Sequence, residues 1–252
     1  MLKAVDISKD YRGKKVLKNL DHEIINNKLI AYIGSNGAGK STLLSILTRT
    51  LEKSSGDVFL HDLSIHKWNS KELSKKISIL RQSNELNIRL TVYDLVSFGR
   101  YPYSKTNLTD VDRAFVDDAI NYLGLSDIKD KFLDELSGGQ RQMAYIAMVL
   151  AQDTNYIFLD EPLNNLDMRH SQKIMKTLKK LVEEKHKTVI IVIHDINFAV
   201  TYADYFVAMK NGQIIKEGSI DEVITNEILQ QIFDVNIEVV TINDKKVCLY
   251  YE

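Results

Sequence analysis

The sequence has few of the residues that cross-link a chain or divide it into linked parts. It contains one cysteine, Cys248, so no disulfide can form within the chain, and a reducing compartment is expected. The simplest interpretation of Cys248 is a buried strand residue. Only two prolines occur, Pro102 and Pro162, and no repeat or stretch rich in proline, glycine and serine is present. Any second domain must therefore be inserted into the first.

Neither an excess of one charge nor a long apolar run is present. Lys and Arg number 33 against 34 Asp and Glu, which argues against nucleic acid as the main ligand. The longest apolar runs, such as residues 189–193, have the length of strands, and the first residues are too charged for a signal peptide. We therefore expect a cytoplasmic chain that spans no membrane by itself. Its 252 residues suit one domain with an insertion.

Short runs of branched and aromatic residues alternate with longer helix-like stretches. The candidate strands are residues 28–34, 57–62, 77–80, 156–160, 188–195 and 205–209. Several are apolar throughout, as strands covered on both faces are. This pattern predicts an α/β fold with a largely parallel sheet core, in which ligands bind at the carboxyl ends of strands. A hairpin near residues 211–218 and a closing strand pair within 237–251 predict an additional antiparallel β portion.

Residues 91–152 interrupt this alternation. Three successive helical patterns, at 91–100, 110–125 and 138–152, have no strand of comparable strength between them. We therefore predict a single domain, 1–252, with a helical subdomain at about 91–152 inserted into its core.

A phosphate loop follows the strand at 28–34. Residues 34–41 (GSNGAGKS) match GxxxxGK[ST] between a predicted strand and a predicted helix, the context that this motif requires. The loop residues are Gly34, Ser35, Asn36, Gly37, Ala38, Gly39, Lys40 and Ser41. Their backbone N–H groups can converge on phosphate oxygens, Lys40 adds a cation for the outer phosphates, and the Ser41 hydroxyl can bind Mg²⁺. Thr42 is expected on the α-phosphate side. The alternative is a glycine-rich turn that happens to precede a helix.

Two adjacent acids end the strand at 156–160. Asp160 is expected to hold the metal, directly or through water, and Glu161 to orient and polarise the attacking water. The alternative is that these acids only end a strand and cap the next helix.

Three further polar or aromatic residues are individually weak candidates. His194 ends an apolar run, where its imidazole could bond a γ-phosphate or the attacking water. Gln82 follows the strand at 77–80, where an amide can bind Mg²⁺ and sense the γ-phosphate. Tyr11 could stack on adenine, although packing on a sheet is commoner for such a residue. Histidines at strand ends are usually structural, and loop glutamines are usually solvated.

A second candidate anion site lies at residues 135–148 (ELSGGQRQMAYIAM). A serine and two glycines precede a helix-forming run, so the helix N-terminus could hold an anion. Taken with the loop, the acid pair and His194, this order resembles the ATP-binding cassette family. The match extends from Tyr11 to Gly218, and the LSGGQ segment, residues 136–140, is its most specific element.

The resemblance implies an ATP-hydrolysing cassette that uses ATP and Mg²⁺ and works as a homodimer. In it, Ser137, Gly138, Gly139 and Gln140 of one copy would complete the ATP site of the other, and Asp167 would lie in a loop that crosses the interface. Asn164 and Asn165 stand where the family more often has Ser and Ala, so the side-chain contacts of this loop stay open. Arg81 stands where a proline is usual, which leaves the geometry before Gln82 open.

Residues 90–104 (LTVYDLVSFGRYPYS) and 166–170 (LDMRH) are most similar to the cassettes of iron(III)-siderophore, haem and cobalamin importers. The similarity implies a peripheral subunit on the cytoplasmic face of the membrane. Its expected partners are permease subunits and, indirectly, an extracytoplasmic binding protein. A short permease helix would dock near residues 82–90. By itself, GRYPY is a helix end followed by a proline turn with surface tyrosines. The alternatives are a soluble cassette of iron–sulfur cluster assembly and an unrelated phosphate-loop enzyme such as a nucleotide kinase.

Overall fold

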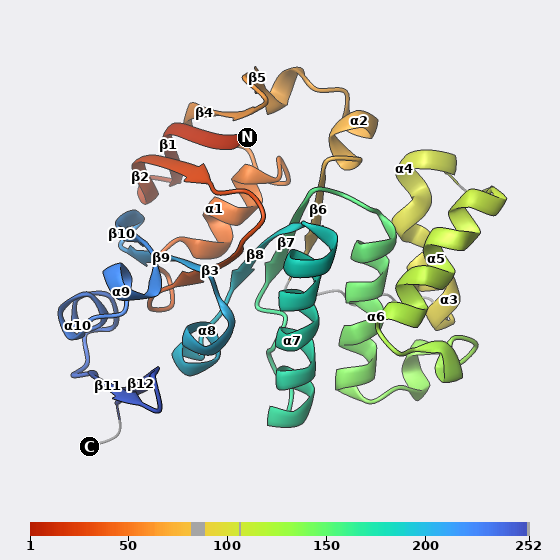
Figure 1. The fold of residues 1–252 in the computed structure, drawn as a ribbon. Helices are drawn as coiled ribbons and strands as arrows, with labels where there is room; N and C mark the ends of the chain where they lie inside the picture. The colour runs from red at the N-terminus through yellow and green to blue at the C-terminus, as the bar shows by residue number, and fades with distance from the viewer. Residues whose placement is uncertain (82–88, 106, 251–252) are drawn as a thin grey trace. The chain divides into compact units, whose positions relative to one another are not determined.

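The computed structural model describes residues 1–81, 89–105 and 107–250. These residues form two compact units. The first unit comprises Met1–Trp68 and Lys179–Glu252, and the second comprises Asn69–Leu178. Each is described separately (Figure 1). No helix in the described part of the chain combines the length and the apolar character needed to cross a bilayer.

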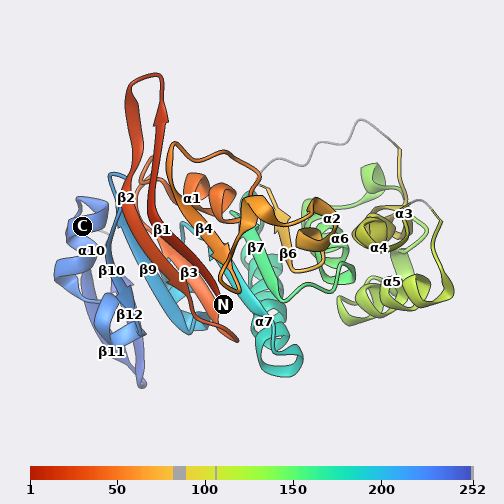
Figure 2. The same ribbon diagram turned by 90° about the horizontal axis from the view of Figure 1, so that it is seen from above.

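The first unit contains an antiparallel sheet in the order β2-β1-β4-β5. Its strands are β1 (Leu2–Tyr11), β2 (Lys14–Ile24), β4 (Ser55–Leu60) and β5 (Leu63–Ser64). Inward apolar side chains such as Leu2, Ile7 and Leu17 are fully buried, and charged residues occupy much of the other face. Figure 2 shows the β1–β2 hairpin extending well beyond β4. The strand predicted at 57–62 is therefore part of an antiparallel sheet, not of the parallel core.

Four other strands of the first unit pair in the order β10-β9-β3-β8. They are β3 (Leu29–Ile33), β8 (Thr188–Val192), β9 (Tyr205–Lys210) and β10 (Gln213–Gly218). β3 is parallel to both β8 and β9, whereas β10 returns antiparallel through a tight turn. Every residue of β3 and β8 is buried, which explains their continuous apolar sequence. The largely parallel α/β core and its antiparallel portion are confirmed.

The remaining elements of the first unit are short. They are α1 (Lys40–Leu47), a 3₁₀ turn at Ile65–Lys67, α8 (Ile196–Tyr202), α9 (Ile220–Val223), α10 (Asn226–Phe233), β11 (Glu238–Ile242) and β12 (Lys245–Leu249). β11 and β12 form a separate hairpin that is joined to α8 by Asn197. The Asn197 amide donates to the Cys248 carbonyl at 3.1 Å and accepts from the Cys248 N–H at 2.9 Å. Cys248 is a buried residue of β12, as expected, and burial raises the pKa of its thiol to about 11.

The second unit pairs two parallel strands, β6 (Ile77–Leu80) and β7 (Tyr156–Asp160). Its helices are α2 (Ser70–Ser74), α3 (Val92–Ser97), α4 (Tyr101–Ser104), α5 (Asp110–Tyr122), α6 (Gly138–Ala151) and the first part of α7 (Met168–Lys185), with 3₁₀ turns at Phe98–Arg100, Ser126–Ile128 and Leu133–Glu135. The described residues between 91 and 152 are thus mainly helical, as predicted. The proposed boundary of a subdomain at 91–152 stays a prediction.

Side-chain caps fix where several of these helices begin. Thr91 and Asp94 cap the start of α3, and Thr109 and Asp112 cap the start of α5. In each pair, the threonine hydroxyl accepts a hydrogen bond from the backbone N–H of the aspartate, and the aspartate carboxylate accepts one from the backbone N–H of the threonine. Buried apolar residues of α3, α5 and α6 pack against one another, and Figure 1 shows the ribbons of these helices near one another. The second unit is therefore a small helical core beside its own strand pair.

A buried ion pair lies within this helical core. Arg100 Nε donates to Asp112 Oδ1 at 2.9 Å, and both side chains are almost fully buried. The guanidinium also stacks on the rings of Tyr103 and Phe115, 3.8 and 4.2 Å from their centroids. Bonds from Thr109 and Arg100 to the carboxylate outweigh its desolvation and lower the pKa of Asp112 to about 2. GRYPY is therefore more than a surface turn, because its arginine is buried.

Candidate active site

The phosphate loop joins a wholly buried strand to a helix. It leaves β3 at Gly34 and enters α1 at Lys40. Gly34 and Gly39 have φ angles of 143° and 102°. A Cβ on Gly34 would lie 2.1 Å from the Met209 carbonyl oxygen, and one on Gly39 would lie 2.7 Å from Leu17 Cδ2. Both positions need glycine because a side chain would be strained and would overlap neighbouring strands.

Lys40 lies folded back over this loop. Its side chain is buried, and Nζ donates to the carbonyl oxygens of Gly34 at 2.7 Å and Ser35 at 3.0 Å. No side chain caps the start of α1, and its first turn contains no acid. The first N–H groups of a helix have no intrahelical partner, and the N-terminus carries a partial positive charge. With the lysine ammonium, this arrangement suits phosphate.

Two other candidates belong to the same unit as the loop. His194 follows β8, which is the parallel neighbour of β3, so His194 and the phosphate loop lie at the same edge of the sheet. The His194 side chain is exposed at this edge. Tyr11 ends β1 with 45% of its surface exposed, and Lys9 Nζ lies 4.9 Å from the centre of its ring. The ring is therefore not buried against a sheet.

Asp160 and Glu161 lie where β7 of the second unit ends. Asp160 is buried at the last strand position. Glu161 has a left-handed backbone, with φ of 53°, which costs a non-glycine residue about 1–3 kcal/mol and is frequent at functional sites. Its Oε2 accepts a hydrogen bond from the side-chain amide of Asn164. Asn164 stands where the family more often has Ser, and it has a structural role here because it orients the Glu161 carboxylate.

The LSGGQ segment forms the start of α6. Ser137 Oγ accepts from the Gln140 N–H at 3.2 Å, and Gln140 Oε1 accepts from the Ser137 N–H at 3.1 Å. This reciprocal cap fixes the helix start. Gly138 and Gly139 occupy the first turn, and a Cβ on Gly139 would lie 2.2 Å from the imidazole of His170. A side chain at the second glycine would therefore have to displace the His170 ring.

His170 also bonds the residue expected at the interface loop. Asp167 Oδ1 lies 2.8 Å from both the backbone N–H and the ring Nδ1 of His170. The bond from the His170 backbone, followed by that from its ring, lowers the pKa of Asp167. Asp167, His170 and Gly139 thus form one chain of contacts in the second unit. The sequence patterns did not identify His170 or Asn164 as site residues, although Asp directly before a helix, as at Asp167, is a recognisable N-cap signal.

The structure brings the predicted residues together in two groups. The first unit holds Tyr11, the phosphate loop and His194, with Ser41 and Thr42 in the first turn of α1. The second unit holds Asp160, Glu161, Asp167 and the LSGGQ segment. Gln82 lies outside the described residues. A glycine loop between a buried parallel strand and a helix is the mark of a phosphate-loop nucleotide-binding protein.

Comparison with known proteins identifies the family. The profile described as ABC transporter matches residues 17–164, so the chain belongs to the ABC transporter family and is an ATPase that binds nucleotide. It is 55% identical over 251 residues to the petrobactin import ATP-binding protein YclP of Bacillus subtilis (strain 168), covering 100% of both chains. It is 39% identical over 246 residues to the iron(3+)-hydroxamate import ATP-binding protein FhuC of the same organism, covering 96% of this chain and 91% of FhuC.

A solved structure agrees with the fold. The dimeric bacterial ABC transporter cassette MJ0796 matches with a TM-score of 0.77 and 29% identity, covering 87% of this chain and 99% of that one.

Proposed function

We propose that this chain is the ATP-hydrolysing subunit of a membrane importer for an iron(III)-siderophore or a related metal chelate. The observation that carries the proposal is the 55% identity to a petrobactin import protein, which covers 100% of both chains. Petrobactin is accordingly the first chelate to test. The relatives with import names do not favour the alternative of iron–sulfur cluster assembly.

The residues of the first unit bind the nucleotide in this proposal. Tyr11 stacks on the adenine, residues 34–39 and Thr42 surround the phosphates, and Lys40 neutralises the outer ones. The geometry of the loop supports these roles, since Lys40 Nζ already lies among the loop carbonyls. His194 bonds the γ-phosphate or the attacking water from the same sheet edge.

Mg²⁺ fits the oxygen donors that the chain offers. It prefers one or two carboxylates with phosphate and water oxygens, and the buried carboxylate of Asp160 and the hydroxyl of Ser41 match this set. Gln82 is a third proposed ligand. When bound, Mg²⁺ supplies charge neutralisation at the outer phosphates. Glu161 orients and polarises the attacking water, and Asn164 holds its carboxylate in place.

The second group of residues acts on a partner copy. We place Ser137, Gly138, Gly139 and Gln140 of one copy against the ATP of the other in a two-fold homodimer, with Asp167 in the interface loop. Gly138 and Gly139 occupy the first turn of α6, where backbone N–H groups have no intrahelical acceptor, and this suits a phosphate there. Closure then depends on the γ-phosphate, and opening depends on its hydrolysis.

The importer assignment adds further partners. The cassette lies on the cytoplasmic face of the membrane, bound to permease subunits that receive the chelate from an extracytoplasmic binding protein. A permease helix docks near residues 82–90, of which 82–88 lie outside the described part of the chain, and it transmits closure of the dimer.

The test compares Glu161→Gln with Glu238→Gln, an exposed position on β11. Two readouts are made: ATPase turnover of the purified chain, and uptake of radioactive iron(III)-petrobactin by cells whose only copy is the variant. Glu161→Gln should lower turnover at least about a hundredfold and abolish uptake, because the attacking water loses its base. Glu238→Gln should leave both unchanged. Lost turnover with normal uptake would refute the importer assignment, and normal turnover would refute the role of Glu161.

A further inference from the structure

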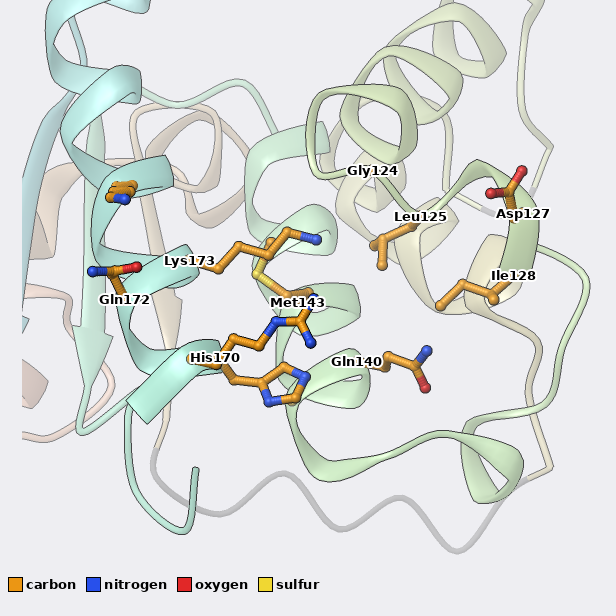
Figure 3. Close-up of a pocket in the computed structure, with 12 residues that line it drawn as sticks. Gly124, Leu125, Asp127, Ile128, Gln140, Met143, His170, Gln172 and Lys173 are labelled. Carbon is orange, nitrogen blue, oxygen red and sulfur yellow. The ribbon is translucent and has the colours of Figure 1, made fainter. Parts of the chain in front are cut away.

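A groove lies within the second unit, beside the start of α6. Its volume is about 610 Å³, and its walls come from α6, from α7 and from the segment that follows α5. Figure 3 shows Lys173 and His170 extending into it from α7, while Leu125 and Ile128 point toward it from the opposite side. All of its lining residues belong to one compact unit. The volume is within the range of about 300–1,000 Å³ typical of small-molecule sites.

One wall of the groove carries a row of cations. Arg169, Lys173 and Lys176 line it from α7. Their spacing of four and three residues places them along one side of the helix, over roughly 10 Å. Among the described lining residues, Asp127 is the one carboxylate. The charge of the groove is therefore strongly unbalanced, although the whole chain has a formal net charge of only -1.

This row is not explained by stabilisation of the helix. Cations near a helix N-terminus oppose the helix dipole, and like charges four residues apart repel each other. Residues 168–182 contain no acid, and the two glutamates of α7 lie near its C-terminus. Farther along α7, Lys179 forms ion pairs with Asp204 and Glu183. Within the described residues, Arg169, Lys173 and Lys176 have no such pair.

The opposite part of the groove contains apolar side chains beside Asp127. Leu125 and Met143 are each only 2% exposed, and Ile128 lies beside them. These side chains form a floor that can take the hydrocarbon part of a ligand, while Arg169 offers a planar fork of donors and the lysines offer point charges. An inorganic ion would use only the cationic wall.

We propose that this groove binds a small organic anion that carries at least two negative charges. The charged groups lie along Arg169, Lys173 and Lys176, and the apolar part contacts Ile128 together with Leu125 and Met143. Gly139 and Gln140 also line the groove, so an occupant contacts the first turn of α6. The site is separate from the phosphate loop, and the proposal does not depend on what the importer transports.

The probe is benzene-1,3,5-tricarboxylate, with benzoate as the singly charged comparison. Binding to the full chain is measured by titration calorimetry with saturating ADP and Mg²⁺, so that the phosphate loop is occupied. Lys173→Gln is compared with Lys180→Gln, which removes the same charge from an exposed position of α7 outside the groove. Circular dichroism checks that both variants are folded.

We expect saturable binding of the tricarboxylate and much weaker binding of benzoate. Lys173→Gln should raise Kd about tenfold, the loss expected for one charged hydrogen bond, and adding Lys176→Gln should raise it further. Lys180→Gln should change Kd less than about twofold. The proposal is overturned if the tricarboxylate does not bind at millimolar concentration. Equal weakening by Lys173→Gln and Lys180→Gln, or binding that nucleotide abolishes, would also overturn it.

Discussion

The phosphate loop and the LSGGQ segment present helix N-termini by different physical means. The phosphate loop depends on backbone geometry: its glycines have positive φ angles, and α1 starts without a side-chain cap. The LSGGQ segment depends on side chains: Ser137 and Gln140 cap each other, and Gly138 and Gly139 are helical without positive φ. An added Cβ should therefore be far more damaging in the phosphate loop than in the LSGGQ segment.

The largest effect is expected at Gly34. In Gly34→Ala, the new methyl would meet the Met209 carbonyl oxygen at 2.1 Å in a strained backbone, so we expect a loss of about 3 kcal/mol or more in unfolding free energy. Gly37→Ala is the matched control, because its φ is 79° but nothing lies within 4 Å of the added atom. It should lose about 1–2 kcal/mol. Urea unfolding measures both, and equal losses would show that the close contact at Gly34 is unimportant.

Acid should weaken the helical core of the second unit, in which Asp112 pairs with Arg100. The pKa of Asp112 is lowered to about 2 in the folded state, from an ordinary value near 3.8. The bonds from Thr109 and Arg100 to the Asp112 carboxylate therefore contribute fully above about pH 4, and their joint contribution of about 2 kcal/mol disappears as the pH falls from 4 to 2. Unfolding by urea between pH 6 and 2.5 measures this slope.

Two variants isolate the carboxylate responsible. Asp112→Asn should be less stable at pH 6 and should lack this part of the acid dependence, whereas Asp110→Asn, on the exposed side of α5, should retain it. An unchanged slope in Asp112→Asn would mean that another carboxylate causes the acid sensitivity.

A smaller effect is expected at Gly139. In Gly139→Ala the methyl would overlap the His170 ring, a side chain that can rotate away at a cost of about 1–2 kcal/mol. Combining it with His170→Ala should recover part of this loss, and Gly138→Ala should cost less because its nearest neighbour is Leu166 at 3.9 Å. Thermal unfolding of the unchanged protein, Gly139→Ala, His170→Ala and the double variant completes a double-mutant cycle. Strict additivity would contradict the proposed contact.

Features encoded by neighbouring residues were predictable from the sequence. The phosphate loop, the acid pair and the LSGGQ segment each depend on a few consecutive residues, and the buried strands at 77–80 and 156–160 were predicted with their correct bounds. β1 and β2 were missed because only one face of each is buried, and their irregular pairing disturbs the alternation of apolar and charged residues.

Contacts between separate segments were not predictable from these patterns. Arg100 was not distinguished from surface residues because its partners, Asp112 and the Ala151 carbonyl, lie 12 and 51 residues away. The bond from Asn164 to Glu161 depends on a left-handed backbone that no sequence pattern indicated. The groove beside α6 is lined by three separate segments, so the sequence alone does not show that the cations of α7 face a cavity.

The double hydrogen bond between Asn197 and Cys248 has a practical consequence for handling the protein. It fastens β12 to the helix that starts two residues after His194. Deleting the last strand would remove both of these bonds from that helix. A rigid fusion attached directly to the strand would strain the helix and the turn at His194 before it. Expression designs should preserve the chain through Leu249 and place any purification label beyond a flexible spacer.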